Sequence, residues 1–293
     1  KSELNIMKTV GLFYFSGTGN TRIVAELLRD SFTRKGYQVD LIRMEDVMNG
    51  LAKFDPAKYD MIGFGSQVIG YGVPNLVKDF LKKLPEGLHQ KTFIFRLAGG
   101  VAPVNYNVSK YMIRVLKAKG YDVFHERLFS LGSNWIKRFS DPVVQQLYRS
   151  TVEKVDQMCD ELIEGRERFY QTGFWMRFGM GFLSFIAGKF FRLTGLDYRV
   201  SASCGNCGLC VSNCPSKNIT IKNGKPSFGL NCSCCMRCLY NCPKQAIQLR
   251  NLSFFAVEGG YNIKKTLARP LAEGETVTEQ PPFFNRYTTD LNF

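Results

Sequence analysis

The hydrophobic positions in the first half of the chain follow two periodicities, those of buried strands and of amphipathic helices. β-prone runs that suit parallel strands buried on both faces occupy residues 8–15, 37–44, 59–66, 91–100 and 121–129. Apolar residues recur at helical spacing after the first run up to Gly36, and again in residues 75–84, 109–120 and 141–164. Five strands that alternate with helices predict an α/β fold with a doubly wound parallel sheet, which binds ligands over the carboxyl ends of its strands.

The turn between the first strand and the first helix is rich in hydroxyl groups and glycine. It consists of Ser16, Gly17, Thr18, Gly19, Asn20 and Thr21. Backbone N–H groups at a helix N-terminus, together with such hydroxyls, form a cradle for a phosphate. The Rossmann fingerprint G-x-G-x-x-G is the alternative, and Asp40 even lies about twenty residues on. However, Arg22 stands where the third glycine would let the helix pack closely on the strand.

This turn fits the pattern [S/T]-x-T-G-x-T and resembles the FMN-phosphate loop of flavodoxins, a resemblance that covers about residues 7–165. The resemblance implies that the loops after the third and fourth strands hold the isoalloxazine ring of FMN. The residues implied are Ser66, Gln67, Tyr71, Gly72, Leu97, Ala98, Gly99 and Gly100. Tyr71 is the candidate for stacking on the ring, although it could equally be a solvent-facing loop residue. Tyr106 and Trp135 are the other aromatic candidates.

Nine of the ten cysteines fall between residues 204 and 242, in two runs of the pattern C-x2-C-x2-C-x3-C-P. Three thiolates at this spacing can wrap one iron–sulfur cubane, while the fourth ligates the other cubane. The first predicted [4Fe–4S] cluster is therefore held by Cys204, Cys207, Cys210 and Cys242. The second is held by Cys214, Cys232, Cys235 and Cys238. Zinc sites use cysteine pairs with longer spacers, which these runs fit badly.

Residues 201–250 resemble the bacterial-type ferredoxin domain with two [4Fe–4S] clusters. With the flavodoxin-like half, the chain resembles the flavodoxin–ferredoxin fusion proteins of anaerobic bacteria and archaea, the ferredoxins of the EFR type. The expected domains are a flavodoxin-like FMN-binding domain (7–165), an apolar and basic interdomain segment (166–200), a small ferredoxin-like domain (201–250) and a C-terminal extension (251–293).

The resemblance implies electron transport between FMN, two [4Fe–4S] clusters and external redox partner proteins. The alternative is an enzyme, an oxidoreductase in which FMN reduces a small-molecule acceptor with electrons from ferredoxin that arrive through the clusters. An enzyme needs a pocket above the flavin with a proton donor, and the candidates are Tyr71, Tyr106 and Arg96. The sequence leaves open whether the protein is an enzyme and whether it forms a homodimer.

Composition and charge indicate which classes of binding partner to expect. The chain has 293 residues, of which 45% are hydrophobic and 22% charged, as in globular proteins. Its net charge of +14 comes without a nucleic-acid-binding motif, so no nucleic acid is expected. Residues 201–250 contain six basic residues and no acidic residue. Two oxidised clusters would carry a charge of about −4, which nearly offsets these bases. The basic residues also favour acidic redox partners. The polar start of the chain predicts no signal peptide and hence a cytoplasmic, reducing location.

Two segments have no assigned cofactor. Residues 173–193 are dense in aromatic and basic residues, and their longest uncharged run, 178–188, is too short to cross a bilayer. We expect its apolar side chains to pack between the two domains and to shield both, with contact to a membrane surface as the alternative. We expect residues 271–293 to form an extended tail that Phe283 and Phe284 dock.

Overall fold

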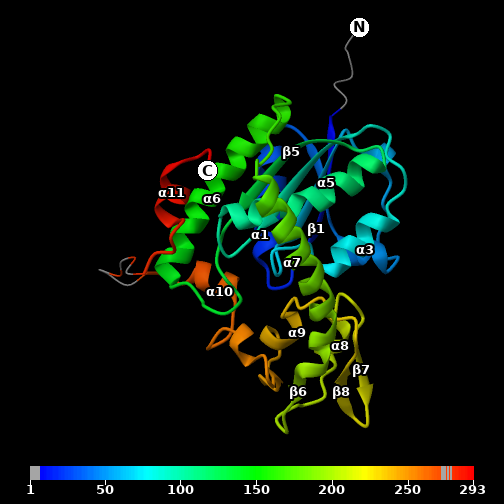
Figure 1. Ribbon diagram of the computed structural model, residues 1–293, viewed down its shortest axis with the longest axis vertical. Coiled ribbons are helices and arrows are strands. Elements are labelled where there is room, and N and C mark those ends of the chain that lie inside the picture. Colours follow the sequence, from blue (N-terminus) through cyan, green and yellow to red (C-terminus); the bar gives the residue numbers. More distant parts are fainter. Residues whose placement is uncertain (1–6, 272–274, 276, 278) are drawn as a thin grey trace.

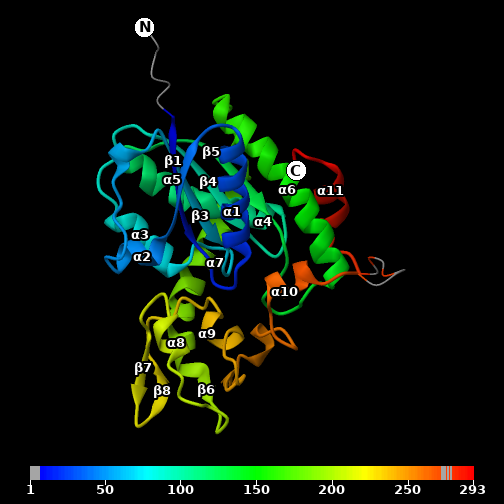
Figure 2. The same cartoon turned by 180° about the vertical axis from the view of Figure 1, so that it is seen from behind.

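The computed structural model describes residues 7–271, 275, 277 and 279–293, which form a larger and a smaller body (Figures 1 and 2). The larger body is built around a parallel sheet, and the smaller one holds nine of the ten cysteines. Residues 1–6 of the polar start, which predicted the cytoplasmic location, lie outside the described residues.

The sheet of the larger body has five strands, all paired in parallel, in the order β2-β1-β3-β4-β5. The strands are β1 (Thr9–Phe15), β2 (Gln38–Arg43), β3 (Met61–Gln67), β4 (Lys91–Leu97) and β5 (Asp122–Phe129). This is the strand order of the flavodoxin-like fold, in which the connections leave β1 and β3 in opposite directions and open a crevice at their carboxyl ends. The predicted α/β sheet is therefore confirmed.

Helices cover both faces of the sheet (Figures 1 and 2). α1 (Asn20–Arg34) and α6 (Asp141–Ile163) pack on one face, while α3 (Asn75–Lys83) and α5 (Val108–Ala118) pack on the other. Three short elements were not predicted: α2 (Met44–Met48), the 3-10 helix η1 (Pro56–Lys58) and α4 (Pro103–Tyr106). They are too short to give a periodic pattern in the sequence.

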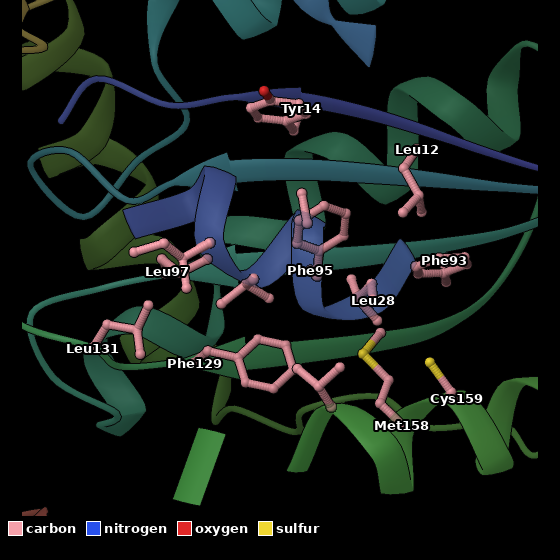
Figure 3. Packing of buried hydrophobic residues seen from close by; sticks show 14 of the residues in the cluster. Leu12, Tyr14, Leu28, Phe93, Phe95, Leu97, Phe129, Leu131, Met158 and Cys159 are labelled. Atoms are coloured by element: carbon pink, nitrogen blue, oxygen red, sulfur yellow. The ribbon is translucent and has the colours of Figure 1, made fainter. Parts of the chain in front are cut away.

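Figure 3 shows buried side chains of the cluster that fixes the sheet to α1 and α6. Phe95 and Phe129 of the sheet belong to the same cluster as Leu28 of α1 and Met158 of α6. Full burial of such a side chain contributes about 1.5–3 kcal/mol. Gly65 in β3 lets the Phe95 ring approach, because a Cβ at Gly65 would lie 2.1 Å from the ring. This packing holds the carboxyl ends of the strands in register.

The smaller body repeats one unit, strand–helix–strand, twice. The first unit is β6 (Tyr198–Val200), α8 (Leu209–Ser212) and β7 (Ile219–Lys222), and the second is β8 (Lys225–Phe228), α9 (Arg237–Tyr240) and β9 (Ile247–Leu249). β6 pairs antiparallel with β9, and β7 with β8, so that each unit pairs only with the other. The Asp197 carboxylate, at the end of the 3-10 helix η2 (Thr194–Asp197), accepts N–H groups from Arg250, Asn251 and Leu252 and ties the two ends together.

The C-terminal extension returns from the smaller body to the larger one (Figures 1 and 2). It contains the 3-10 helix η3 (Ser253–Phe255), α10 (Ile263–Ala268) and α11 (Phe284–Thr289), and the last two pack on α6. Phe284 is buried as expected, whereas Phe283 is only partly buried. The expected extended tail is wrong for α11, because Tyr287 is buried and its hydroxyl oxygen accepts the N–H of Ser130.

Residues 174–193 form the helix α7 (Phe174–Leu193), which leads from the larger body to the smaller one (Figure 1). Ten of its large apolar side chains are exposed, and only Phe191 is buried. The expectation that these side chains pack between the bodies is therefore wrong for most of the helix. Among the described residues, none of the helices has the length and apolar character that crossing a bilayer requires.

Candidate functional site

The turn after β1 leaves polar groups without partners. Gly19, at φ 106°, precedes α1, and no side chain caps the first N–H groups of this helix. Ser16 Oγ accepts the N–H of Gly19 at 3.1 Å. Thr21 is fully buried, and its hydroxyl has no hydrogen-bond partner among the described residues. Because buried polar groups are normally paired, a free hydroxyl beside an uncapped helix N-terminus fits a bound phosphate.

A cleft lies beside this turn, at the carboxyl edge of the sheet. We call it the sheet-edge cleft; its lining residues are Thr18, Asn20, Gln67, Val68, Ile69, Leu97, Ala98, Gly99, Gly132, Ser133, Asn134 and Trp135. Six of them belong to the set implied by the flavodoxin resemblance: Thr18, Asn20, Gln67, Leu97, Ala98 and Gly99. The structure thus brings parts of the three expected loops to one place.

A fourth loop, after β5, completes the sheet-edge cleft. Asn134 Nδ2 donates to Thr18 Oγ1 at 2.8 Å, which ties this loop to the turn after β1. The Trp135 ring packs against Phe255 and Phe191, at centroid distances of 4.8 and 5.3 Å. The sequence analysis named only Trp135 here. The rest of the loop could have been found, because it follows a parallel strand whose carboxyl end must lie at the same edge.

Further contacts hold residues of the expected set in place. Ser66 is fully buried, and its hydroxyl donates to the carbonyl oxygen of Gln67. The Gln67 side chain accepts the N–H of Gly17 at 2.7 Å. Gly100 faces the C-terminal extension, where a Cβ would lie 3.2 Å from the ring of Phe283.

Two tyrosines that were candidates for the flavin ring lie elsewhere. Tyr71, together with Gly72, lines a different cleft between α5 and α7. Tyr106 stacks on Tyr170 at a centroid distance of 4.3 Å. Neither side chain lines the sheet-edge cleft, whose aromatic residue is Trp135.

Cysteines of the smaller body line two cavities, which we call site A and site B. The lining of site A includes the predicted first set, Cys204, Cys207, Cys210 and Cys242, and also Cys238 of the second set. The lining of site B includes Cys214, Cys232, Cys235 and Cys238. Cys234 is buried and lines neither cavity, while Cys159 is buried in the core of the larger body.

The thiols are not arranged around a single ion. No group of three or more His, Cys, Asp or Glu in the described part of the chain is close enough to hold one metal ion. Two thiolates on one tetrahedral zinc, at about 2.3 Å each, would lie about 3.8 Å apart. In a cubane each thiolate binds a different iron, so the ligands surround a larger volume. Each cavity is lined by the four thiols that one such cluster requires.

The two cysteine sites differ in burial. Cys207 of site A is exposed, whereas Cys235 of site B is buried, which raises the pKa of its thiol to about 12. The same contact occurs once in each repeated unit: a backbone N–H donates to the thiol sulfur of the last cysteine in the run. Cys214 accepts from Asn218 at 3.2 Å, and Cys242 accepts from Ala246 at 3.3 Å.

Site B lies directly against the turn after β1. A Cβ at Gly17 would lie 2.3 Å from the carbonyl oxygen of Cys235, so only glycine allows this approach. Arg237, which lines both cysteine sites, donates to the carbonyl oxygens of Ser16 and Gly17 at 2.6 and 3.4 Å. Its guanidinium also pairs at 2.7 Å with the Glu45 carboxylate, and both side chains are largely buried.

Two tyrosines, one in α9 and one in the C-terminal extension, reinforce this contact. The Tyr240 hydroxyl donates to the carbonyl oxygen of Asn134 and accepts the N–H of Val257. Tyr261, in the C-terminal extension, donates to Asn20 Oδ1 at 2.7 Å. No pattern in the sequence indicated these contacts, because they join residues that lie more than a hundred positions apart, except for the bond between Tyr240 and Val257.

Comparisons with known proteins identify structures of similar fold but no family. No family model and no curated protein matches the chain. Similar solved structures include a short-chain flavodoxin associated with a non-canonical PDU bacterial microcompartment (15% identity, TM-score 0.41, covering 54% of this chain and 98% of that one). Flavodoxin 2 of Bacillus cereus (20%, 0.38, 53% and 98%) and general stress protein 14 of Treponema denticola in complex with FMN (14%, 0.38, 53% and 99%) are others. The fold assignment rests on the strand order.

Replacing Arg237 tests the contact between the two bodies. Arg237→Met leaves the buried Glu45 carboxylate without its cation. We expect the free energy of unfolding to fall by about 3–5 kcal/mol. The double variant Arg237→Met/Glu45→Met removes both charges and should recover most of this loss. Denaturant unfolding, monitored by circular dichroism, measures both changes.

The matched control is Arg250→Met, an exposed arginine of the same body, which should change the free energy of unfolding by no more than about 0.5 kcal/mol. Equal losses in Arg237→Met and Arg250→Met would show that the buried ion pair does not join the bodies.

Proposed function

We propose that the chain is an electron-transfer protein that holds FMN in the sheet-edge cleft and a [4Fe–4S] cluster in each of sites A and B. The observation that carries this proposal is the contact between Gly17, in the turn that would bind the FMN phosphate, and Cys235 of site B. When bound, FMN exchanges one or two electrons and each cluster exchanges one. The fusion thereby joins partners that transfer different numbers of electrons.

The gradient in burial supports a direction for the path. Site A, where Cys207 is exposed, is accessible to a redox partner protein. Site B is enclosed by Tyr198 and Phe228, which stack at a centroid distance of 4.9 Å, and it faces the larger body. Electrons from a partner would therefore enter at site A and reach the sheet-edge cleft through site B.

The basic residues of the smaller body suit this role. The six basic residues among residues 201–250 would offset the negative charge of the clusters. Arg237 lines both cysteine sites and contacts the turn after β1, so its positive charge would stabilise the more anionic, reduced states. An acidic surface on the redox partner would complement the remaining bases.

The alternative function, an FMN-dependent reductase of a small molecule, gains no support from the proton-donor candidates. Arg96 is fully buried, where it pairs with Glu126 at 3.1 Å and donates to the carbonyl oxygen of Asn105. Tyr71 and Tyr106 are also absent from the lining of the sheet-edge cleft. The geometry therefore favours an electron carrier over an enzyme.

Replacing Thr21 tests the phosphate site. In Thr21→Val the buried hydroxyl is lost, and we expect FMN to bind roughly tenfold to a hundredfold more weakly, as for a lost hydrogen bond to a charged group. Riboflavin, which lacks the phosphate, should bind the variant and the original protein equally. Quenching of flavin fluorescence on titration of the flavin-free protein measures both affinities.

Thr33→Val, the same change at an exposed position of α1, is the control and should leave both affinities unchanged. If Thr21→Val weakened riboflavin as much as FMN, the turn after β1 would not be a phosphate site.

Paired cysteine variants test the crossed ligand sets. The intact protein, purified without oxygen, should contain about eight irons per chain. Cys204→Ala/Cys242→Ala removes two ligands of site A only, so about four irons should remain. Cys204→Ala/Cys214→Ala removes one ligand from each site, and both clusters should be impaired. Iron and sulfide analysis measures the content.

If each run instead held its own cluster, the two double variants would exchange their results. Cys234→Ala, which changes a cysteine that lines neither cavity, should keep the full iron content.

Electron delivery through site A tests the path. A protein donor, reduced ferredoxin, should reduce the flavin of the intact protein rapidly in stopped-flow mixing without oxygen. In Cys204→Ala/Cys242→Ala the same reaction should become much slower, because the exposed entry point is lost. Reduction of the same flavin by dithionite, a small reductant that reaches the flavin directly, should be unchanged.

Equal rates from ferredoxin in both proteins would mean that the flavin receives electrons without site A, and the proposed path would be wrong.

A further inference from the structure

The outward face of α7 carries a stripe of large apolar side chains that the described residues do not cover. Its members include Trp175 (81%), Phe178 (68%), Phe182 (62%), Phe185 (59%) and Ile186 (49%). They recur at intervals of three and four residues, so they lie on one side of the helix. Soluble surfaces rarely expose so continuous an apolar patch unless it contacts a partner or a membrane.

The opposite face of α7 already anchors the helix to the larger body. Ser184 lies beside Gly72, where a Cβ would be 2.0 Å from its hydroxyl oxygen. Ala187 and Phe191 close around Gly70 in the same way, at 3.2 and 2.3 Å. The helix is therefore held in place without its outward face, and that face is free to bind something else.

A basic cleft adjoins this stripe, between α7 and the helices α3 and α5. Its charged residues are Lys78, Lys110, Arg114 and Arg177, and no acidic residue lines it. Among the described residues, no carboxylate forms an ion pair with any of these four. Phe185 lines the cleft as well as belonging to the stripe, so the apolar and the basic surfaces are continuous.

Charge along the sequence agrees with this arrangement. Residues 168–196, which include α7, contain four basic residues and no acidic residue. Two of the bases, Arg177 and Lys189, lie over aromatic rings of the helix at 5.8 and 4.7 Å from the ring centroid. An interfacial helix has this composition, with aromatic residues on one side and Lys and Arg beside them.

We propose that α7 and the basic cleft dock the protein on the surface of an anionic phospholipid membrane. The helix would lie in the plane of the interface, with Trp175, Phe178 and Phe182 between the headgroups and the acyl chains. Lipid phosphates would enter the basic cleft and neutralise Lys110 and Arg114. This proposal is independent of the cofactors, because no residue of the stripe lines the sheet-edge cleft or a cysteine site.

A second copy of the chain fits the same face less well. In a twofold dimer the same patch would meet itself, and the bases of one copy would face those of the other. Each copy carries a net charge of +14, so the contact would bring like charges together. A membrane with anionic headgroups supplies the opposite charge and also an apolar layer.

Cosedimentation with vesicles tests the proposal. We expect the holoprotein to bind vesicles of equal parts phosphatidylcholine and phosphatidylglycerol, and to bind vesicles of phosphatidylcholine alone much more weakly. Phe182→Asp/Ile186→Asp should abolish the binding. Leu51→Asp/Leu88→Asp makes the same change at two exposed leucines elsewhere and should bind as before.

Charge reversal in the basic cleft forms the second arm. Lys110→Glu/Arg114→Glu should weaken binding to the anionic vesicles by at least roughly tenfold. Lys53→Glu/Lys264→Glu lowers the net charge equally at exposed positions outside the cleft and should have a smaller effect. Tryptophan emission should shift to the blue on binding, and Trp175→Phe should lose most of this shift while still sedimenting with the vesicles.

Three outcomes would overturn the proposal. The first is no binding to anionic vesicles, and the second is equal binding to neutral ones. The third is a dimer in analytical ultracentrifugation that Phe182→Asp/Ile186→Asp dissociates, without vesicle binding by the original protein. This last result would assign the stripe to a second copy of the chain.

Discussion

The arrangement of the molecule depends on one close contact, in which the backbone of Cys235 rests on the backbone of Gly17. A side chain at position 17 would separate the two loops, since its Cβ would overlap the Cys235 carbonyl oxygen. Arg237 closes the same contact by binding two carbonyl oxygens of the turn and the buried Glu45. Breaking this pair would leave a carboxylate unpaired in the interior, which is costly. The orientation of the two bodies is therefore strongly constrained.

The C-terminal extension strengthens this constraint from the other side. Tyr261 binds Asn20 at the start of α1, and Tyr240 joins the fourth loop of the sheet-edge cleft to Val257. The turn after β1 is thus held by the sheet, the smaller body and the extension. Under the proposed function this rigidity has a direct use, because it keeps the separation between the flavin and site B constant.

The long helix α7, in contrast, is held on one side only. One side is fixed by the close approach of Gly70 and Gly72, while the other side is apolar and exposed. The sequence pattern alone suggested an element packed between domains, because aromatic residues are usually buried. The smaller body instead attaches through the Cys235 loop and the extension, which leaves most of α7 without a partner. Exposure of these side chains, together with the adjoining basic cleft, replaces the expected interdomain packing with the proposed docking surface.

Local patterns in the sequence were sufficient for the five strands, the four main helices and the turn after β1, whereas the crossed cysteine sets remain a prediction from the same kind of spacing. Each of these depends on the spacing of neighbouring residues or on the rule that parallel strands end at one edge of the sheet. The fourth loop at Trp135, the bridging role of Arg237 and the contact of Tyr261 with Asn20 depended on the tertiary structure. They join residues from distant parts of the chain. The local periodicity of the sequence does not predict which surfaces will pack against each other. The same reason explains why α7 was assigned to the wrong environment: its composition is local, whereas its burial is decided by how the two bodies pack.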